Sequence, residues 1–158
     1  MGTNGSSQTV SPIGSRWAAR ASGASDWFEV NQQRIDAFAT ATGDAQWIHM
    51  KSSEIEAGPF GAPIAHGLLL LSLAIKLARD CGAIPHATWV LYAFEKLRFR
   101  SPVRSGARIR CIVSDVSWRE LGPRRLLDAR LVIEIEHETT PALTTNCSLF
   151  CLDPKPGP

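Results

Sequence analysis

The sequence predicts an α+β fold in which an antiparallel sheet wraps around one long, buried helix. Residues 64–82 form a nearly continuous leucine-rich run whose polar side chains fall on one narrow stripe, so most of this helix is enclosed. Residues 88–152 then supply four segments rich in β-branched and aromatic residues, separated by short turns. One enclosed helix followed by an antiparallel meander favours a single domain built around that helix. The polar stripe consists of Ser72, Lys76, Arg79 and Asp80.

Shorter elements are expected before the central helix. Residues 25–30 have the composition of a short strand. Asn31 suits the N-cap of a following helix, and Gly43 suits its C-terminal end. A second short helix is expected over residues 51–58, followed by a Pro- and Gly-containing loop over residues 59–63. The residues just after Gly43 therefore lie in a connection that is supported by a helix.

The predicted strands all follow the central helix. One of them alternates apolar and polar side chains over residues 126–137, the pattern of a strand with one buried face. Short linkers join the strands, as is usual between antiparallel neighbours. The other predicted strands are residues 88–100, 107–116 and 142–152.

Composition limits the classes of function. The 158 residues are 44% hydrophobic and 20% charged with a net charge of +2, too small to favour nucleic acid or an anionic membrane as partner. The longest apolar stretch ends at Lys76 and is too short to span a bilayer. Four cysteines without a CxxC pair indicate reduced thiols in a cytoplasmic protein.

The expected domain organisation is simple. Residues 1–24 lack acidic side chains and are rich in Gly, Ser, Thr and Ala, which predicts a disordered leader without the apolar core of a signal peptide. The folded domain is expected over residues 25–153, followed by a short tail over residues 154–158.

The stretch TGDAQWIH, residues 42–49, carries the candidate chemistry. A carboxylate at Asp44 and an imidazole at His49 could share one water, remove one proton and supply another, as addition of water across a double bond requires. The same two residues would also suit a turn aspartate and a structural histidine. The four histidines have no HxH or HExxH spacing, so no metal site is expected.

Two linked motifs give this stretch a family resemblance. The segments RIDAFATATGDAQWIH and PIAHGLLLLSL resemble the hydratase motif of the MaoC-like, R-specific enoyl-CoA hydratase/dehydratase family, which has the hot-dog fold. The match is strongest over residues 34–73, and the order of elements agrees over most of the chain. The resemblance implies a single hot-dog domain.

The resemblance also implies roles for individual residues. Asp44 and His49 match the catalytic pair of the family, and the backbone N–H of Gly67 matches the donor to the thioester oxygen. A first-turn N–H suits that role because it has no partner within the helix and lies at the positive end of the helix dipole. The implied substrate-binding residues are Gln46, Trp47, Ile64, Ala65, His66 and Leu68, and His66 is given no catalytic role.

The chain departs from the family pattern near the expected site. Gln46 and Trp47 replace the usual Asn-Pro, Lys51 stands where an aspartate is usual, and Ile75 occupies a position often held by serine. These changes leave the acid–base pair intact, and they bear on substrate choice. A Gly67→Ala change is expected to keep or slightly raise stability while lowering activity.

The implied reaction is the reversible hydration of trans-2-enoyl thioesters to (R)-3-hydroxyacyl thioesters. No metal or redox cofactor is expected, because coenzyme A or phosphopantetheine belongs to the substrate. A symmetric homodimer with both copies of Asp44 near the interface would protect the exposed sheet edge. The alternatives are a Michael-type cyclase of the same fold and a non-catalytic subunit of a heterodimer. A hot-dog thioesterase is disfavoured, since residues 67–79 lack a carboxylate.

Overall fold

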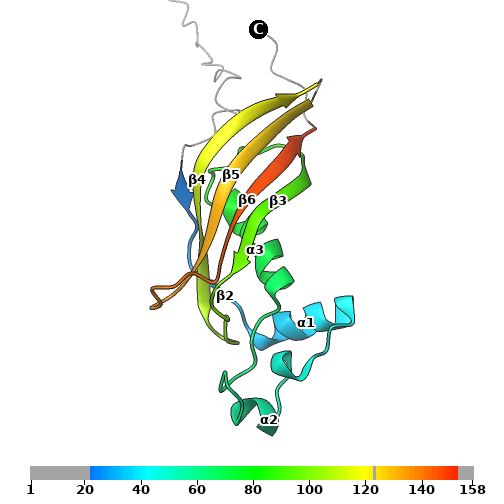
Figure 1. Ribbon diagram of the computed structural model, residues 1–158, viewed down its shortest axis with the longest axis vertical. Coiled ribbons are helices and arrows are strands. Elements are labelled where there is room, and N and C mark those ends of the chain that lie inside the picture. Colours follow the sequence, from blue (N-terminus) through cyan, green and yellow to red (C-terminus); the bar gives the residue numbers. More distant parts are fainter. Residues whose placement is uncertain (1–21, 123, 153–158) are drawn as a thin grey trace, which may run out of the picture.

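The computed structural model describes residues 22–122 and 124–152. Its sheet has the strand order β1-β4-β5-β6-β3, with β2 also paired to β4, and all pairs are antiparallel. The sheet curves around α3, while α1 and α2 lie at the opposite end of the molecule from the β4–β5 turn (Figure 1). The strands are β1 (Gly23–Ala24), β2 (Phe28–Glu29), β3 (Trp89–Phe99), β4 (Arg108–Leu121), β5 (Arg124–Ile135) and β6 (Leu143–Cys151). The helices are α1 (Gln32–Thr42), the 3₁₀ turn η2 (Trp47–His49), α2 (Ser53–Glu56) and α3 (Gly67–Asp80).

The core lies between α3 and the inner face of the sheet. Seven α3 side chains are buried, five of them leucines, and each fully buried leucine stabilises the fold by about 1.5–3 kcal/mol. Strand β5 buries alternate residues, among them Leu127, Leu131 and Ile133, against this helix. The sheet wrapped around one enclosed helix confirms the predicted α+β, hot-dog fold.

The central helix is shorter at its start than the sequence predicts. Residues 64–66 are extended, and α3 begins at Gly67 with His66 as N-cap at φ −60° and ψ 138°. Tertiary hydrogen bonds explain the difference, because the Ala65 N–H donates to the Val103 carbonyl at 2.8 Å and Ile64 pairs with Arg104. The segment before α3 is therefore fixed by the loop that follows β3.

The caps of α1 are confirmed. The Asn31 side chain accepts a hydrogen bond from the Arg34 N–H, and Gly43 has a left-handed φ of 77° that places its N–H on the Ala39 carbonyl. This left-handed turn directs the following residues away from the helix axis. It therefore sets the position of Asp44.

The expected N-terminal strand is divided in two, and its pairing starts before residue 25. Strands β1 and β2 both pair with β4, and the Ser25 N–H between them donates to the Cys111 carbonyl at 2.9 Å. Gly23, within the expected leader, pairs with Val113 of β4, and a Cβ added to it would come close to Cys81 and Ala83. Residues 1–21 of the expected leader and the expected tail lie outside the described residues.

A β-bulge lies where β4 runs past its predicted end at residue 116. In β4 the register shifts between Ser114 and Ser117, where Asp115 has a φ of 53°. Ile109 and Val113 face the core before the bulge, whereas Val116 packs against the core after it, so the alternation changes phase. The alternation of apolar and polar residues is thus interrupted at the bulge, although the strand continues to Leu121.

Two further expectations concern membrane helices and thiols. Among the described residues, no helix is long and apolar enough to cross a membrane. The four cysteines form no disulfide, and Cys111 and Cys147 are buried in the core.

Candidate active site

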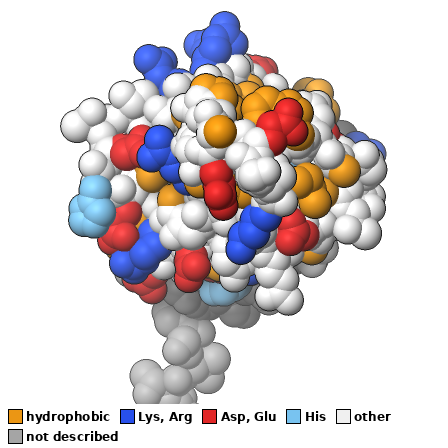
Figure 2. All heavy atoms as spheres, turned by 90° about the horizontal axis from the view of Figure 1, so that it is seen from below, with side chains coloured by type: hydrophobic (Ala, Val, Ile, Leu, Met, Phe, Trp, Pro, Cys, Tyr) orange, Lys and Arg blue, Asp and Glu red, His pale blue; other side chains and the backbone are white. Residues whose placement is uncertain are grey.

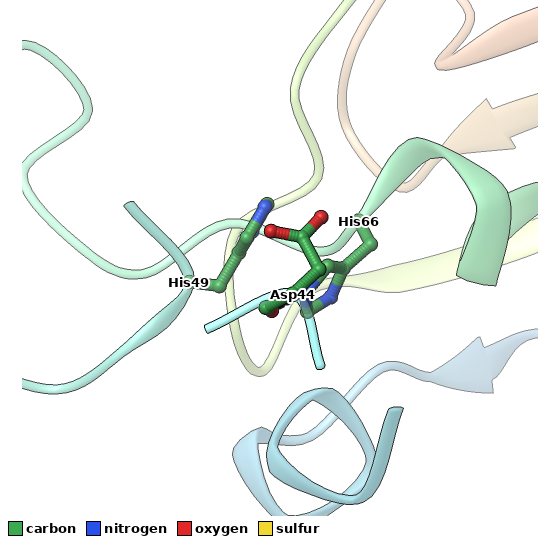
Figure 3. Close-up of side chains that lie close together, drawn as sticks. All are labelled: Asp44, His49 and His66. Carbon is green, nitrogen blue, oxygen red and sulfur yellow. Dashed lines mark hydrogen bonds between the residues drawn. The ribbon is translucent and has the colours of Figure 1, made fainter. Parts of the chain in front are cut away.

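Three polar side chains meet between the end of α1 and the start of α3. Asp44 follows the Gly43 cap, His49 ends η2, and His66 caps α3. One ligand atom from each lies within 4.8 Å of the others, and Figure 3 shows the Asp44 carboxylate beside the His49 ring. The surface at this end of the molecule carries interspersed acidic and basic side chains around small apolar patches (Figure 2).

His49 is held on both its side chain and its backbone. Its Nδ1 lies 2.7 Å from the Ile64 carbonyl oxygen, which can only accept, so Nδ1 carries a proton. In the neutral ring the lone pair is then on Nε2. The His49 carbonyl accepts a hydrogen bond from Gln32 Nε2 at 2.8 Å, and the side chain is buried. The imidazole thus has a fixed tautomer and an open nitrogen.

Asp44 is held through its backbone and leaves its carboxylate open. Its N–H donates to Thr42 Oγ1 at 3.3 Å, and its carbonyl accepts from His66 Nε2 at 2.9 Å. Over residues 22–122 and 124–152, no hydrogen bond or ion pair reaches the carboxylate itself. Carboxylate and imidazole lie within 4.8 Å of each other without a direct bond, so both are placed to contact one water.

The same three residues are also the candidate metal ligands of the described chain. The rings of His49 and His66 are stacked, with centroids 3.6 Å apart and planes inclined by 24°. Lone pairs of imidazole nitrogens lie in the ring plane, so near-parallel rings direct them side by side rather than toward one point. This geometry suits a shared water better than a three-ligand metal centre.

Gly67 lies at the first position of α3, against an aromatic side chain. The first intrahelical bond is from the Leu70 N–H to the His66 carbonyl, so the N–H of Gly67 precedes the hydrogen-bonded turns. A Cβ at Gly67 would come within 2.9 Å of Phe99 Cε1. The expectation that alanine keeps or raises stability here therefore needs correction, because the Phe99 ring must move first.

A pocket of about 580 Å³ opens at this helix start. It is largely apolar and includes His49 and Gly67 together with four of the predicted substrate-binding residues, Gln46, Ile64, Ala65 and Leu68. Other side chains that line it were not predicted. These are Ile48, Phe60, Leu70, Phe99, Arg100, Ser101 and Pro102.

Two of the predicted substrate-binding residues lie outside the pocket lining. The Trp47 side chain is 45% exposed and packs beside Gly58, where an added Cβ would come within 3.3 Å of the indole. His66 lies behind the pocket, stacked against His49. Of the residues that depart from the family pattern, Lys51 is exposed and Ile75 packs against the core.

Four of the seven lining residues that the sequence missed come from the end of β3 and the loop after it. Phe99 ends that strand, and Arg100 to Pro102 follow it, so the pocket depends on where the strand returns to the start of α3. The Arg104 Nε also donates to the Phe60 carbonyl at 2.8 Å and holds the loop over the pocket. Only the contact between distant segments identifies these residues, since no local motif marks them.

A curled antiparallel sheet wrapped around one enclosed helix defines the hot-dog class of folds. The MaoC like domain matches residues 17–134, and the chain belongs to the MaoC-like dehydratase family of lyases. It is 36% identical over 122 residues to 3-hydroxyacyl-thioester dehydratase Z of Mycobacterium tuberculosis, covering 76% of this chain and 81% of that protein.

Two further comparisons agree with this family. The chain is 37% identical over 146 residues to nodulation protein N of Rhizobium leguminosarum bv. viciae, covering 86% of this chain and 88% of the other. The solved structure of the (R)-hydratase from A. caviae matches the fold with a TM-score of 0.67 at 22% identity, covering 81% of this chain and 92% of that one.

Proposed function

We propose that this protein catalyses the reversible hydration of trans-2-enoyl thioesters to (R)-3-hydroxyacyl thioesters. One observation carries the proposal: the Asp44 carboxylate and the His49 imidazole lie open to each other within 4.8 Å, beside an apolar pocket at a helix N-terminus. The 36% identical relative is named a 3-hydroxyacyl-thioester dehydratase, and the chain belongs to the MaoC-like dehydratase family. Both observations support hydration or dehydration of a thioester as the class of reaction.

The two side chains share the protons of one water. In the hydration direction the water oxygen forms a bond to C3 of the substrate while the C2–C3 π bond breaks. One proton of the water is taken by the pair, and one proton is delivered to C2, so the water accounts for both added groups, the hydroxyl at C3 and the hydrogen at C2. The protonated Nδ1 of His49, fixed on the Ile64 carbonyl, leaves Nε2 available for this exchange.

The thioester oxygen gains negative charge as the bond to C3 forms. The N–H of Gly67 at the start of α3 is the proposed donor to this oxygen, because a preorganised donor stabilises developing charge most. The apolar pocket walls would hold the acyl thioester, and Arg100 at its lining is the proposed contact for the phosphate-bearing carrier, coenzyme A or phosphopantetheine.

The test is incubation with crotonyl-CoA and with longer enoyl-CoAs, followed by loss of enoyl absorbance and by product chirality. We expect hydration to the (R)-product by the wild type. We expect His49→Ala to lose on the order of a hundredfold or more in rate while remaining folded, the scale of one acid–base group. Near wild-type hydration by this folded variant would contradict the assigned site.

We also propose that the chain acts as a symmetric homodimer that pairs along β3. This strand ends the sheet order among the described residues, and its exposed side chains include Val90, Leu91 and Tyr92 at 45%, 49% and 52% exposure. An apolar unpaired edge strand is a template for pairing with another chain. Phe99 at the end of β3 lines the pocket, so this interface would lie next to the site.

Sedimentation analysis of the purified chain tests the assembly. A dimer at micromolar concentration is expected, and Leu91→Lys on the edge should weaken it, with Lys51→Glu as a control on an exposed residue away from β3. A fully active monomer would contradict the proposal. Activity that appears only with a different partner chain would favour the non-catalytic subunit instead.

A further inference from the structure

The His66 imidazole is more deeply buried than its helix-capping position requires. The residue is 3% exposed, yet its side chain makes no capping hydrogen bond to α3. Its Nδ1 is buried and has no partner among the described residues. Burying an unpaired ring nitrogen is destabilising, so an apolar side chain would serve a purely structural position better.

The contacts that His66 does make lead to the two proposed catalytic residues. Its Nε2–H donates to the Asp44 carbonyl at 2.9 Å, across 22 residues of chain. Its ring stacks on the His49 ring at 3.6 Å, and Phe38 packs on it at 5.0 Å. Since a carbonyl oxygen only accepts, this bond fixes the proton of His66 on Nε2.

These contacts restrain different degrees of freedom. The hydrogen bond fixes the backbone from which the Asp44 carboxylate projects, while the stack fixes the plane of the His49 ring. The Ile64 carbonyl fixes Nδ1 of the same ring, and Gly67 directly follows His66 in the chain. Residues 64–67 are thus one short segment that places the acid, the imidazole and the helix N-terminus together.

We propose that His66 is a positioning residue for the reaction. Its Nε2–H bond to the Asp44 backbone and its stack on His49 hold the Asp44 and His49 side chains in fixed positions relative to each other. The proposal rests on the function proposed above. His66 touches no substrate atom and transfers no proton; it acts through Asp44 and His49. If the two side chains lose these relative positions, the rate falls although no reacting group is removed, because small misplacements of reacting groups lower the rate strongly.

Matched variants separate the hydrogen bond from simple filling of space. In His66→Gln the amide nitrogen can reach the place of Nε2, whereas in His66→Asn it is too short and lies nearer the place of Nδ1. We expect kcat to fall about tenfold or more in the Asn variant and clearly less in the Gln variant, with KM little changed. Equal kcat in the two variants, or a change confined to KM, would overturn the proposal.

A double variant tests whether His66 acts through His49. In the His49→Ala background, His66→Asn should cause a smaller further fall in the residual rate than in the wild type, because the ring that it positions is gone and the bond to the Asp44 backbone alone remains to be lost. A further fall of the same size as in the wild type would show that the stack on His49 contributes nothing and would overturn the proposal as stated. His49→Ala alone tests the proposed function, so failure of one idea is distinguishable from failure of the other.

The wild-type protein provides a test that needs no folded variant. Nitrogen–proton correlation spectra of the histidine rings should show His66 protonated on Nε2 and His49 protonated on Nδ1. The opposite tautomer at His66 would remove the hydrogen bond to Asp44 and would overturn the proposal.

Discussion

Two aspartates of this chain differ in how fully their carboxylates are partnered. Asp128, on the outer face of the sheet, accepts hydrogen bonds from Arg119 Nε at 2.9 Å and from the Ser148 hydroxyl. The Arg119 hydrogen bond is the main cause that holds the pKa of Asp128 below its usual value. Asp44, by contrast, is bonded only through its backbone over the described residues.

The volume of a pocket does not by itself identify the proposed site of the reaction. Asp128 lies in a hollow of about 610 Å³ on the sheet, slightly larger than the pocket of about 580 Å³ at the start of α3. Its carboxylate is engaged by neighbours and therefore suits a structural role. The Asp44 carboxylate lies beside an imidazole with an open nitrogen and suits proton transfer.

The largest expected effect contrasts the two carboxylates directly. Asp44→Asn should lower the hydration rate on the order of a hundredfold or more and leave the melting temperature nearly unchanged, because it removes a proton-transferring group that has no structural partner. Asp128→Asn should lower the melting temperature and leave the hydration rate nearly unchanged. Steady-state kinetics and thermal melts of both variants check this, and an active Asp44→Asn protein would contradict it.

The second prediction concerns crowding at the helix start. Gly67→Ala should lower kcat about tenfold, because the added methyl group reaches the Phe99 ring and the space beside the N–H. Adding Phe99→Leu relieves the crowding against the ring. Activity that stays low in the double variant supports the donor role of Gly67, whereas full recovery assigns the loss to the displaced ring.

The second prediction has two control variants, one in each of the two pockets. Phe99→Leu alone shows what the ring itself contributes to the rate. Asn146→Ala, in the hollow on the outer face of the sheet, should leave kcat unchanged.

The third prediction follows the pH dependence of the paired carboxylate. The pKa of Asp128 is lowered in the folded state from a usual value of 3.8, so the unfolded chain binds its proton more readily. The stability that Asp128 provides is fully present above about that pH and is lost as pH falls through the lower, folded value. Denaturant unfolding of wild type and Asp128→Asn should therefore converge in acid, and a constant difference would contradict the pairing.

The smallest expected effect concerns the Cys147 thiol. Burial, and after it the nearby Asp128 charge, raises the pKa of Cys147 to about 11. Asp128→Asn should therefore lower this pKa modestly and speed alkylation of Cys147 a few-fold at pH 8, measured by mass spectrometry of the labelled peptide. Ser148→Ala removes a hydrogen bond and keeps the charge, so it is the matched control, and equal acceleration there would point to loosened packing instead.

Local sequence signals predicted the parts of the site that depend on neighbouring residues. The Asn31 and Gly43 caps fix where α1 starts and ends, and Asp44 directly follows that end. These features need only backbone preferences within a few residues. The leucine-rich periodicity of α3 likewise revealed the buried helix, because burial on most sides leaves a visible pattern.

The missed features depend on contacts between distant segments. Phe99 lies against Gly67 only because β3 reaches the start of α3 in one register, and a bulge with Lys96 at φ 53° sets that register. The stack of His66 on His49 depends on side-chain orientation in the folded state. Neither contact leaves a local pattern, so sequence reasoning assigned His66 to the substrate and did not single out Phe99.

The bonds between the segment before α3 and the loop after β3 have a consequence for how the molecule acquires its activity during folding. Arg104 bonds to the Phe60 carbonyl across 44 residues, and Ser105 N–H bonds to the Pro63 carbonyl at 2.7 Å. A chain that ends before residue 103 contains every side chain of the proposed site but lacks the strand partner that orients them. The geometry of the proposed site is thus a long-range property, acquired only when folding brings the second half of the chain onto the first.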